Sequence, residues 1–248
     1  MLLYADDTAI FFSHKDPNVI SSTLSSAMHS CHDWLTDNKL SLHLGKTESI
    51  LFGPKRKIQC FDIANFSIWC NGLKIEAKSS VKYLGIIIDN FLSGEQIVNS
   101  IVKKVNQRLK FLYRNRSCLS LPSRKTLCSA LIQCHFDYAC TSWYEGLSNK
   151  LKQQLQVVQN RMVRFILDLH PRSSVSFKEF EKLGYLKVND RVCQIRLNHV
   201  SNISNGNCPG YLNTHFKRKT SYATRASHLD YTIPKIRGVE NTTFFIMP

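Results

Sequence analysis

Apart from one helical stretch at 17–36, apolar positions in the first third of the chain indicate strands, and beyond about residue 93 they recur with a period near 3.6. The first two apolar, β-prone runs cover 2–5 and 8–12 and flank the pair Asp6 and Asp7. Two short strand-like runs with a polar break between them are typical of a β-hairpin. The pattern therefore predicts a hairpin with two carboxylates at its tip.

A helix is predicted over 17–36. Asp16 is a good N-cap and Pro17 suits the first helical turn. Apolar residues then recur at helical spacing and define one face. That face comprises Ile20, Leu24, Ala27, Met28, Cys31, Trp34 and Leu35.

The next apolar positions indicate strands again. Leu40, Leu42 and Leu44 alternate with other residues, which predicts a strand that breaks after Leu44 and resumes at 50–52. The basic run 55–57 is expected to be a loop.

Two hairpin-like segments follow. Asn71 and Gly72 form the strongest two-residue turn signal and predict a hairpin over 66–75. The run 81–89 predicts a strand pair or one long bent strand, interrupted at Gly85.

The remainder of the chain is predicted to be helical up to a polar, turn-rich tail. Predicted helices cover 95–114, a segment beginning near Pro122, 149–169, 176–183 and 190–202. The second of these carries the apolar stripe Leu127, Leu131, Cys134 and Tyr138. The fold class is thus α+β, a small antiparallel sheet with one helix followed by a helical bundle.

Net charge separates the two parts of the chain more sharply than periodicity does. Residues 1–95 hold 9 Lys and Arg against 10 Asp and Glu, whereas residues 96–248 hold 24 against 8. The whole +15 charge therefore resides in the second part, with no acid between Gln96 and Ser120. A basic face of this size suits a polyanion such as nucleic acid, and the alternative is a merely solvated helix face.

The sequence also excludes some classes of protein. No apolar run is long enough to cross a bilayer, and two acids precede the first basic residue, unlike a signal peptide. We expect an intracellular protein, nuclear or cytoplasmic, with no membrane partner. The nine cysteines contain no Cys-x-x-Cys pair and are expected to be reduced thiols without a disulfide partner.

The pair Asp6 and Asp7 is the clearest candidate for chemistry. Adjacent carboxylates repel each other unless a cation is bound, and Mg²⁺ prefers hard oxygen ligands of this kind. Two such ions can activate a 3′-hydroxyl and stabilise a departing pyrophosphate. An ordinary solvated Asp-Asp turn is the alternative.

Several motifs together resemble a reverse transcriptase of the non-LTR, LINE-like retrotransposon group. The motifs are Tyr4-Ala5-Asp6-Asp7-Thr8, the segment from Trp34 through Leu42 to Lys46-Thr47-Glu48, Val81-Lys82-Tyr83-Leu84-Gly85 with Asp89, and Leu151 to Arg164. They occur in the family's order and spacing, and the resemblance covers nearly the whole chain. The resemblance implies a palm remnant over 1–54, a connecting hairpin and primer grip over 55–92, a basic helical thumb over 93–204 and an irregular tail over 205–248.

The resemblance also implies roles for individual residues. Asp6 and Asp7 would bind Mg²⁺ or Mn²⁺, and Lys46 would protonate the leaving pyrophosphate. The primer or nucleic acid would contact the remaining site residues, which are Tyr4, Ala5, Tyr83, Leu84, Gly85, Lys103, Lys104, Arg108, Lys110 and Arg114. The implied partners are an RNA template, a DNA primer and a deoxynucleotide.

Two features depart from the family pattern. His43 stands where relatives usually have asparagine before the lysine turn. The family's two-ion site also needs an aspartate from a strand that precedes this hairpin, and its nucleotide pocket needs the fingers. We therefore expect the 248 residues alone not to polymerise, since the two-ion site and deoxynucleotide binding require that upstream half.

Three other interpretations stay open at this stage. The chain could be a non-catalytic nucleic-acid-binding remnant or the inert product of a decayed retroelement, with sheet edges that lack partners. A zinc site is the third, but the spacing of Cys118, Cys128, Cys134 and Cys140 fits no compact ligand pairing. Small packed thiols are favoured for these cysteines.

Overall fold

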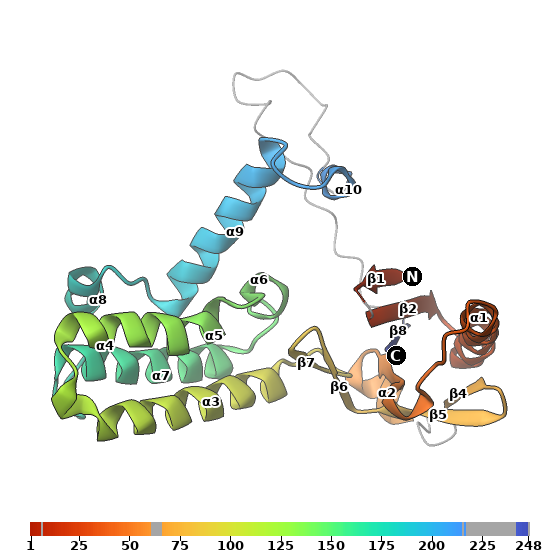
Figure 1. The fold of residues 1–248 in the computed structure, drawn as a ribbon, viewed down its shortest axis with the longest axis horizontal. Helices are drawn as coiled ribbons and strands as arrows, with labels where there is room; N and C mark the ends of the chain where they lie inside the picture. The colour runs from red at the N-terminus through yellow and green to blue at the C-terminus, as the bar shows by residue number, and fades with distance from the viewer. Residues whose placement is uncertain (6, 61–65, 215, 217–241, 248) are drawn as a thin grey trace. The chain divides into compact units, whose positions relative to one another are not determined.

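The structure is a computed structural model that describes residues 1–5, 7–60, 66–214, 216 and 242–247. It divides into two compact units (Figure 1). The first comprises Met1–Asn99 together with Arg237–Pro248, and the second comprises Ser100–Ile236. Sheet structure lies in the first unit, and the second is helical over its described residues.

A six-stranded sheet with the order β1-β2-β8-β3-β5-β4 forms the centre of the first unit. All neighbouring strands are antiparallel except β3 and β5, which run parallel. The strands are β1 (Leu2–Tyr4), β2 (Asp7–His14), β8 (Thr242–Met247), β3 (Glu48–Phe52), β5 (Leu73–Lys78) and β4 (Ser67–Cys70).

Helix α1 (Pro17–Asp37) begins as the sequence predicts. The Asp16 side chain accepts a 2.9 Å hydrogen bond from the Asn18 backbone N–H, and Pro17 occupies the first turn. The buried face of α1 belongs to one core cluster with the sheet, and each such side chain stabilises the fold by about 1.5–3 kcal/mol. That cluster comprises Ile20, Leu24, Met28, Leu51, Phe66, Ile68, Cys70 and Ile75.

The hairpin predicted at Asn71 and Gly72 is present, and a second tight turn divides the run 81–89 into two strands. Asn71 and Gly72 adopt φ of 49° and 75° between β4 and β5. Leu84 and Gly85 adopt 45° and 83° between β6 (Ser80–Tyr83) and β7 (Ile86–Asp89). Two successive positive φ values match the right-handed twist of the flanking strands. The run 81–89 is therefore a strand pair.

The link from β7 to the next helix is held by the carboxylate of Asp89. It accepts hydrogen bonds from the backbone N–H groups of Phe91, Ser93 and Gly94 at 2.9–3.1 Å. Asp89 is 6% exposed, so this buried charge is satisfied by backbone donors. Its role is to shape the start of α3 (Glu95–Arg114).

The second unit is built from helices that share a core. Buried side chains such as Leu112, Ile132, Phe136, Phe165 and Phe180 form its interior. After α3 come α4 (Leu121–Cys128), a π-helical segment (Ser129–Gln133), α5 (Cys134–Asp137), α6 (Cys140–Trp143), α7 (Asn149–Leu167), α8 (Phe177–Leu183), α9 (Val188–Ser204) and α10 (Gly210–Asn213).

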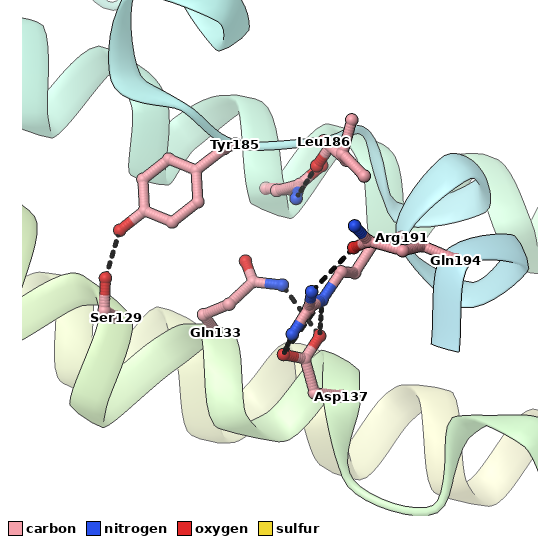
Figure 2. Close-up of polar contacts among 8 residues, drawn as sticks. Ser129, Gln133, Asp137, Tyr185, Leu186, Arg191 and Gln194 are labelled. Carbon is pink, nitrogen blue, oxygen red and sulfur yellow. Dashed lines mark hydrogen bonds and ion pairs between the residues drawn. The ribbon is translucent and has the colours of Figure 1, made fainter. Parts of the chain in front are cut away.

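Polar contacts join the π-helical segment, α5, α7 and α9 around the residues drawn in Figure 2. Arg191 donates to the Asp137 carboxylate from Nη2 at 2.9 Å and from Nε at 3.3 Å. Gln133 donates to the same carboxylate at 2.9 Å. Gln159, fully buried, donates to the Leu186 carbonyl at 2.9 Å. These bonds give buried polar groups their partners, and such groups would destabilise the fold if they were buried without any.

Two local predictions in the first unit are wrong. Residues 40–43 form no strand, and Leu44–Lys46 is a 3-10 turn in which the Lys46 N–H donates to the His43 carbonyl at 2.9 Å. The basic run expected to be a loop begins helix α2 (Lys55–Cys60). Lysine and arginine are good helix formers, and Ile58, 3% exposed, anchors this turn.

Two further predictions in the helical region and the tail are also wrong. The stripe through Cys134 and Tyr138 is exposed at those two residues, and the buried stripe is Cys128, Ile132, Phe136 and Cys140. The π-helical segment widens the turn between Cys128 and Cys134, and the extended Tyr138 and left-handed Ala139 end the helix before Cys140. The tail expected to be irregular contains α10 and ends in strand β8.

Candidate nucleic-acid interface and catalytic hairpin

The β1–β2 hairpin carries the candidate catalytic carboxylates. Tyr4 pairs with Asp7 as the last antiparallel pair, and Ala5 adopts a left-handed φ of 53°. Tyr4 is 64% exposed, whereas Asp7 is half-buried at the start of β2. Asp6 lies outside the described residues. Across the part of the chain that is described, no group of three His, Cys, Asp or Glu side chains could hold a metal ion.

Lys46 lies at the end of the 3-10 turn before β3, with its side chain exposed. The His43 carbonyl accepts from both the Lys46 N–H and the Thr47 hydroxyl, at 2.9 and 3.3 Å. A Cβ at Gly45 would lie 3.1 Å from the His43 ring, so glycine permits the close approach of that ring. Histidine at position 43 is thus compatible with a tight turn that presents Lys46.

The predicted grip residues lie at the tip of the β6–β7 hairpin. Tyr83 is half-buried and packs against a small cluster of Ile50, Phe52 and Val81. Leu84 and Gly85 form the turn itself. The hairpin is therefore fixed to the first unit by packing on one side, while Gly85 is exposed.

The basic residues of α3 lie on different faces of that helix. Lys103, Lys110 and Arg114 follow one another at i, i+7 and i+11 on an exposed line, and Lys104 is exposed beside them. Between Glu95 and Asp137 the sequence contains no acid, so no carboxylate from this segment neutralises that line. An exposed row of cations on a rigid helix is suited to contact successive phosphates.

Arg108 lies apart from this line and turns into the helical unit. Its guanidinium donates to the Leu131 carbonyl and contacts Nε2 of His135. Burial, followed by the charges of Arg108 and Lys104, lowers the pKa of His135. Since a guanidinium can only donate, the neutral imidazole accepts at Nε2. Arg108 thus serves packing in this structure, which its charge in the sequence does not reveal.

Two further cations lie on α7 opposite α3. Arg161 donates to the Asn106 side-chain oxygen at 3.0 Å, and Arg164 donates to the Ser173 carbonyl at 2.8 Å. With Lys110 and Tyr113 they line an open pocket of about 510 Å³. The sequence places Arg161 and Arg164 in a recognisable segment but gives them no role, because only the fold brings α7 beside α3.

Comparison with known proteins gives one distant relative. The chain is 24% identical over 169 residues to a probable RNA-directed DNA polymerase from transposon BS of Drosophila melanogaster. The matched region is 66% of this chain but 18% of that polymerase, so the chain spans only a small part of the relative's length.

Other comparisons add nothing to this relationship. No family model matches the chain. No solved structure matches it. Among the helices in the described residues, none combines the length and apolar character that a bilayer crossing requires.

Proposed function

We propose that this chain is the C-terminal part of a retrotransposon reverse transcriptase and binds a template–primer duplex through the exposed basic line of α3. The observation that carries the proposal is the row of Lys103, Lys110 and Arg114 with Lys104 beside it, within residues 96–136, which contain no acid. The distant similarity to an RNA-directed DNA polymerase names the class of nucleic-acid chemistry.

In this proposal the first unit contributes part of a polymerase palm, and the helices after α3 form the thumb. The hairpin that carries Asp7 supports the palm assignment, because β1 and β2 are joined in register up to the Tyr4–Asp7 pair. A rigid hairpin is a suitable support for metal ligands that must hold a fixed geometry. The β6–β7 turn with Gly85 would contact the primer backbone.

Catalysis in the proposed complete enzyme uses two divalent ions. Asp6 and Asp7 would supply carboxylate ligands, and a bound Mg²⁺ pair supplies the charge that stabilises the attacking and leaving oxygens. Lys46, which is exposed at its turn, would donate a proton to the leaving pyrophosphate. Two carboxylates are fewer than this chemistry needs, so the 248 residues alone should bind the duplex without extending it.

Duplex binding is tested by the salt dependence of the affinity. We compare the unaltered chain with a triple variant, Lys103→Gln, Lys104→Gln and Arg114→Gln. A matched control removes three exposed cations elsewhere, at Lys150, Lys178 and Lys182. The slope of log K against log salt should fall by about 0.9 per lost phosphate contact in the α3 variant. An unchanged slope in that variant, or an equal fall in the control, would contradict binding by α3.

Polymerisation is tested separately by primer extension on poly(rA)–oligo(dT) with Mg²⁺. No extension together with salt-sensitive binding is the expected result for these 248 residues. Extension that disappears in an Asp6→Asn, Asp7→Asn variant would refute the inactivity of the isolated chain. Absence of both binding and extension would favour the inert product of a decayed element.

A further inference from the structure

The pocket between α3 and α7 is a second positively charged site, which shares Lys110 with the exposed line on α3 and otherwise draws its cations from α7. Its described lining contains three cations and no acid, namely Lys110, Arg161 and Arg164, with Asn106, Leu109, Tyr113 and Pro171. Four of these residues lie on one flank of α3, at a spacing of three or four positions, namely Asn106, Leu109, Lys110 and Tyr113. A volume of about 510 Å³ falls in the range of small-molecule sites.

We propose that this pocket binds a single nucleotide unit, with its phosphate on the three cations and its ring against Tyr113, Leu109 and Pro171. The proposal goes beyond duplex binding, because contacts along a duplex backbone require no pocket and no apolar wall. It stands on the geometry of the second unit alone.

The two arginines are each held by a hydrogen bond that leaves other N–H donors of the guanidinium unused. Arg161 uses Nη1 for Asn106, and Arg164 uses Nε for the Ser173 carbonyl. Guanidinium groups carry five N–H donors, so each arginine retains donors for a phosphate oxygen. A side chain fixed by one hydrogen bond loses less freedom when a ligand binds, which favours a defined anion site.

The apolar wall is also fixed by packing. The Tyr113 ring makes an edge-to-face contact with Phe165 at 4.9 Å between centroids. The Arg116 guanidinium lies 6.0 Å from the centroid of the same ring. Burial raises the pKa of Tyr113, so the phenol stays neutral and does not repel an anion. A neutral aromatic wall beside three cations matches the two halves of a nucleotide.

The test measures binding of a nucleoside monophosphate, inorganic phosphate and a short single-stranded oligonucleotide to the chain by calorimetry. Lys110→Gln and Arg161→Gln should each weaken nucleotide binding at least tenfold. Lys103→Gln removes the same charge from the exposed line and should change it less than twofold. Both pocket positions are exposed, so the variants are expected to fold, as circular dichroism will show.

The arms of this experiment separate the alternatives. Tighter binding of the oligonucleotide than of the monophosphate would assign the site to a nucleic-acid strand, and equal binding would assign it to a free nucleotide. Inorganic phosphate binding as tightly as the monophosphate, no saturable binding, or an equal effect of Lys103→Gln would each overturn the proposal. A loss of duplex binding in the α3 triple variant with normal nucleotide binding would show that the two sites are independent.

Discussion

Removing the Asp137 carboxylate should destabilise the helical unit measurably. This side chain accepts two hydrogen bonds of 2.9 Å, from Arg191 and Gln133, and further ones of 3.3 Å from Arg191 (Figure 2). Hydrogen bonds to a charged partner contribute about 1.5–3 kcal/mol each. Gln133 already has one buried oxygen without a partner, so Asp137→Ala would leave both of its polar ends unsatisfied.

Solvent exposure reduces the expected loss. The side chains of Arg191 and Asp137 are 38% and 24% exposed, so water can replace part of the lost contact. We therefore expect Asp137→Ala to lower the free energy of unfolding by about 2–3 kcal/mol. For a unit of this size that corresponds to roughly 6–12 °C in Tm.

The assay is guanidinium unfolding followed by the fluorescence of Trp143, whose ring N–H donates to the Tyr138 carbonyl at 3.1 Å. Trp34 and Trp69 lie in the first unit and are largely exposed, so both are replaced by phenylalanine in the background. A double-mutant cycle with Arg191→Ala isolates the pair and should give a coupling of about 1 kcal/mol or more.

A matched control uses the more exposed ion pairs of Glu145 with Arg196 and Lys152. Glu145→Ala should cost less, because exposed pairs contribute little. A loss in Asp137→Ala no larger than that in Glu145→Ala, or a cycle without coupling between Asp137 and Arg191, would refute this role for the Asp137 carboxylate.

Three further predictions follow from pKa shifts and backbone geometry. The pKa of His135 is lowered on folding, so its contribution to stability is present above about pH 6.5 and is lost as the pH falls toward its lower folded pKa. Unfolding midpoints from pH 8 to 5 should therefore decline less steeply in His135→Asn, and equal slopes would contradict this. Burial raises the pKa of the Cys128 thiol to about 12. Alkylation at pH 8 read by mass spectrometry should thus modify exposed Cys118 first, and early labelling of Cys128 would be inconsistent with the fold. Gly72→Ala should cost about 1–2 kcal/mol through backbone strain alone, because its φ is 75° and nothing lies within 4 Å of an added Cβ. An unchanged Tm for this variant would argue against the left-handed turn.

Local signals in the sequence were sufficient wherever the structure is determined by neighbouring residues. Asp16 and Pro17 define the start of α1, and Asn71 and Gly72 define a hairpin turn, because each acts on the backbone within a few positions. The helix over residues 95–114 was predicted with the bounds of α3. Such features need no knowledge of the rest of the fold.

The wrong predictions concern elements whose structure depends on more than the local spacing of apolar residues. A 4-3-4 spacing through Leu127, Leu131, Cys134 and Tyr138 fits one ordinary α-helix. The π-helical segment and the helix end at Tyr138 interrupt that helix, and Cys128 with its stripe is buried instead. Strand β8 contains threonine, phenylalanine and isoleucine, which favour strands, but its partners β2 and β3 are far away in sequence.

In the candidate site, too, the sequence predicts local features but not those that depend on how the helices pack. Charge alone identified the basic helix but grouped Arg108 with the exposed cations, although its guanidinium is bound to the Leu131 carbonyl. It also gave no role to Arg161 or Arg164, which reach the pocket only because α7 packs beside α3. Whether Asp6 and Asp7 form a metal site stays a prediction.

The position of β8 between β2 and β3 has a consequence for synthesis on the ribosome. About 190 residues separate Phe52 from Thr242, and the helical unit lies between them. Since synthesis adds about 5–20 residues per second, the strand that joins β2 and β3 is made roughly 10–40 s after β3. During that interval the helical unit can fold first, while the nascent sheet presents open edges to chaperones and to neighbouring nascent chains.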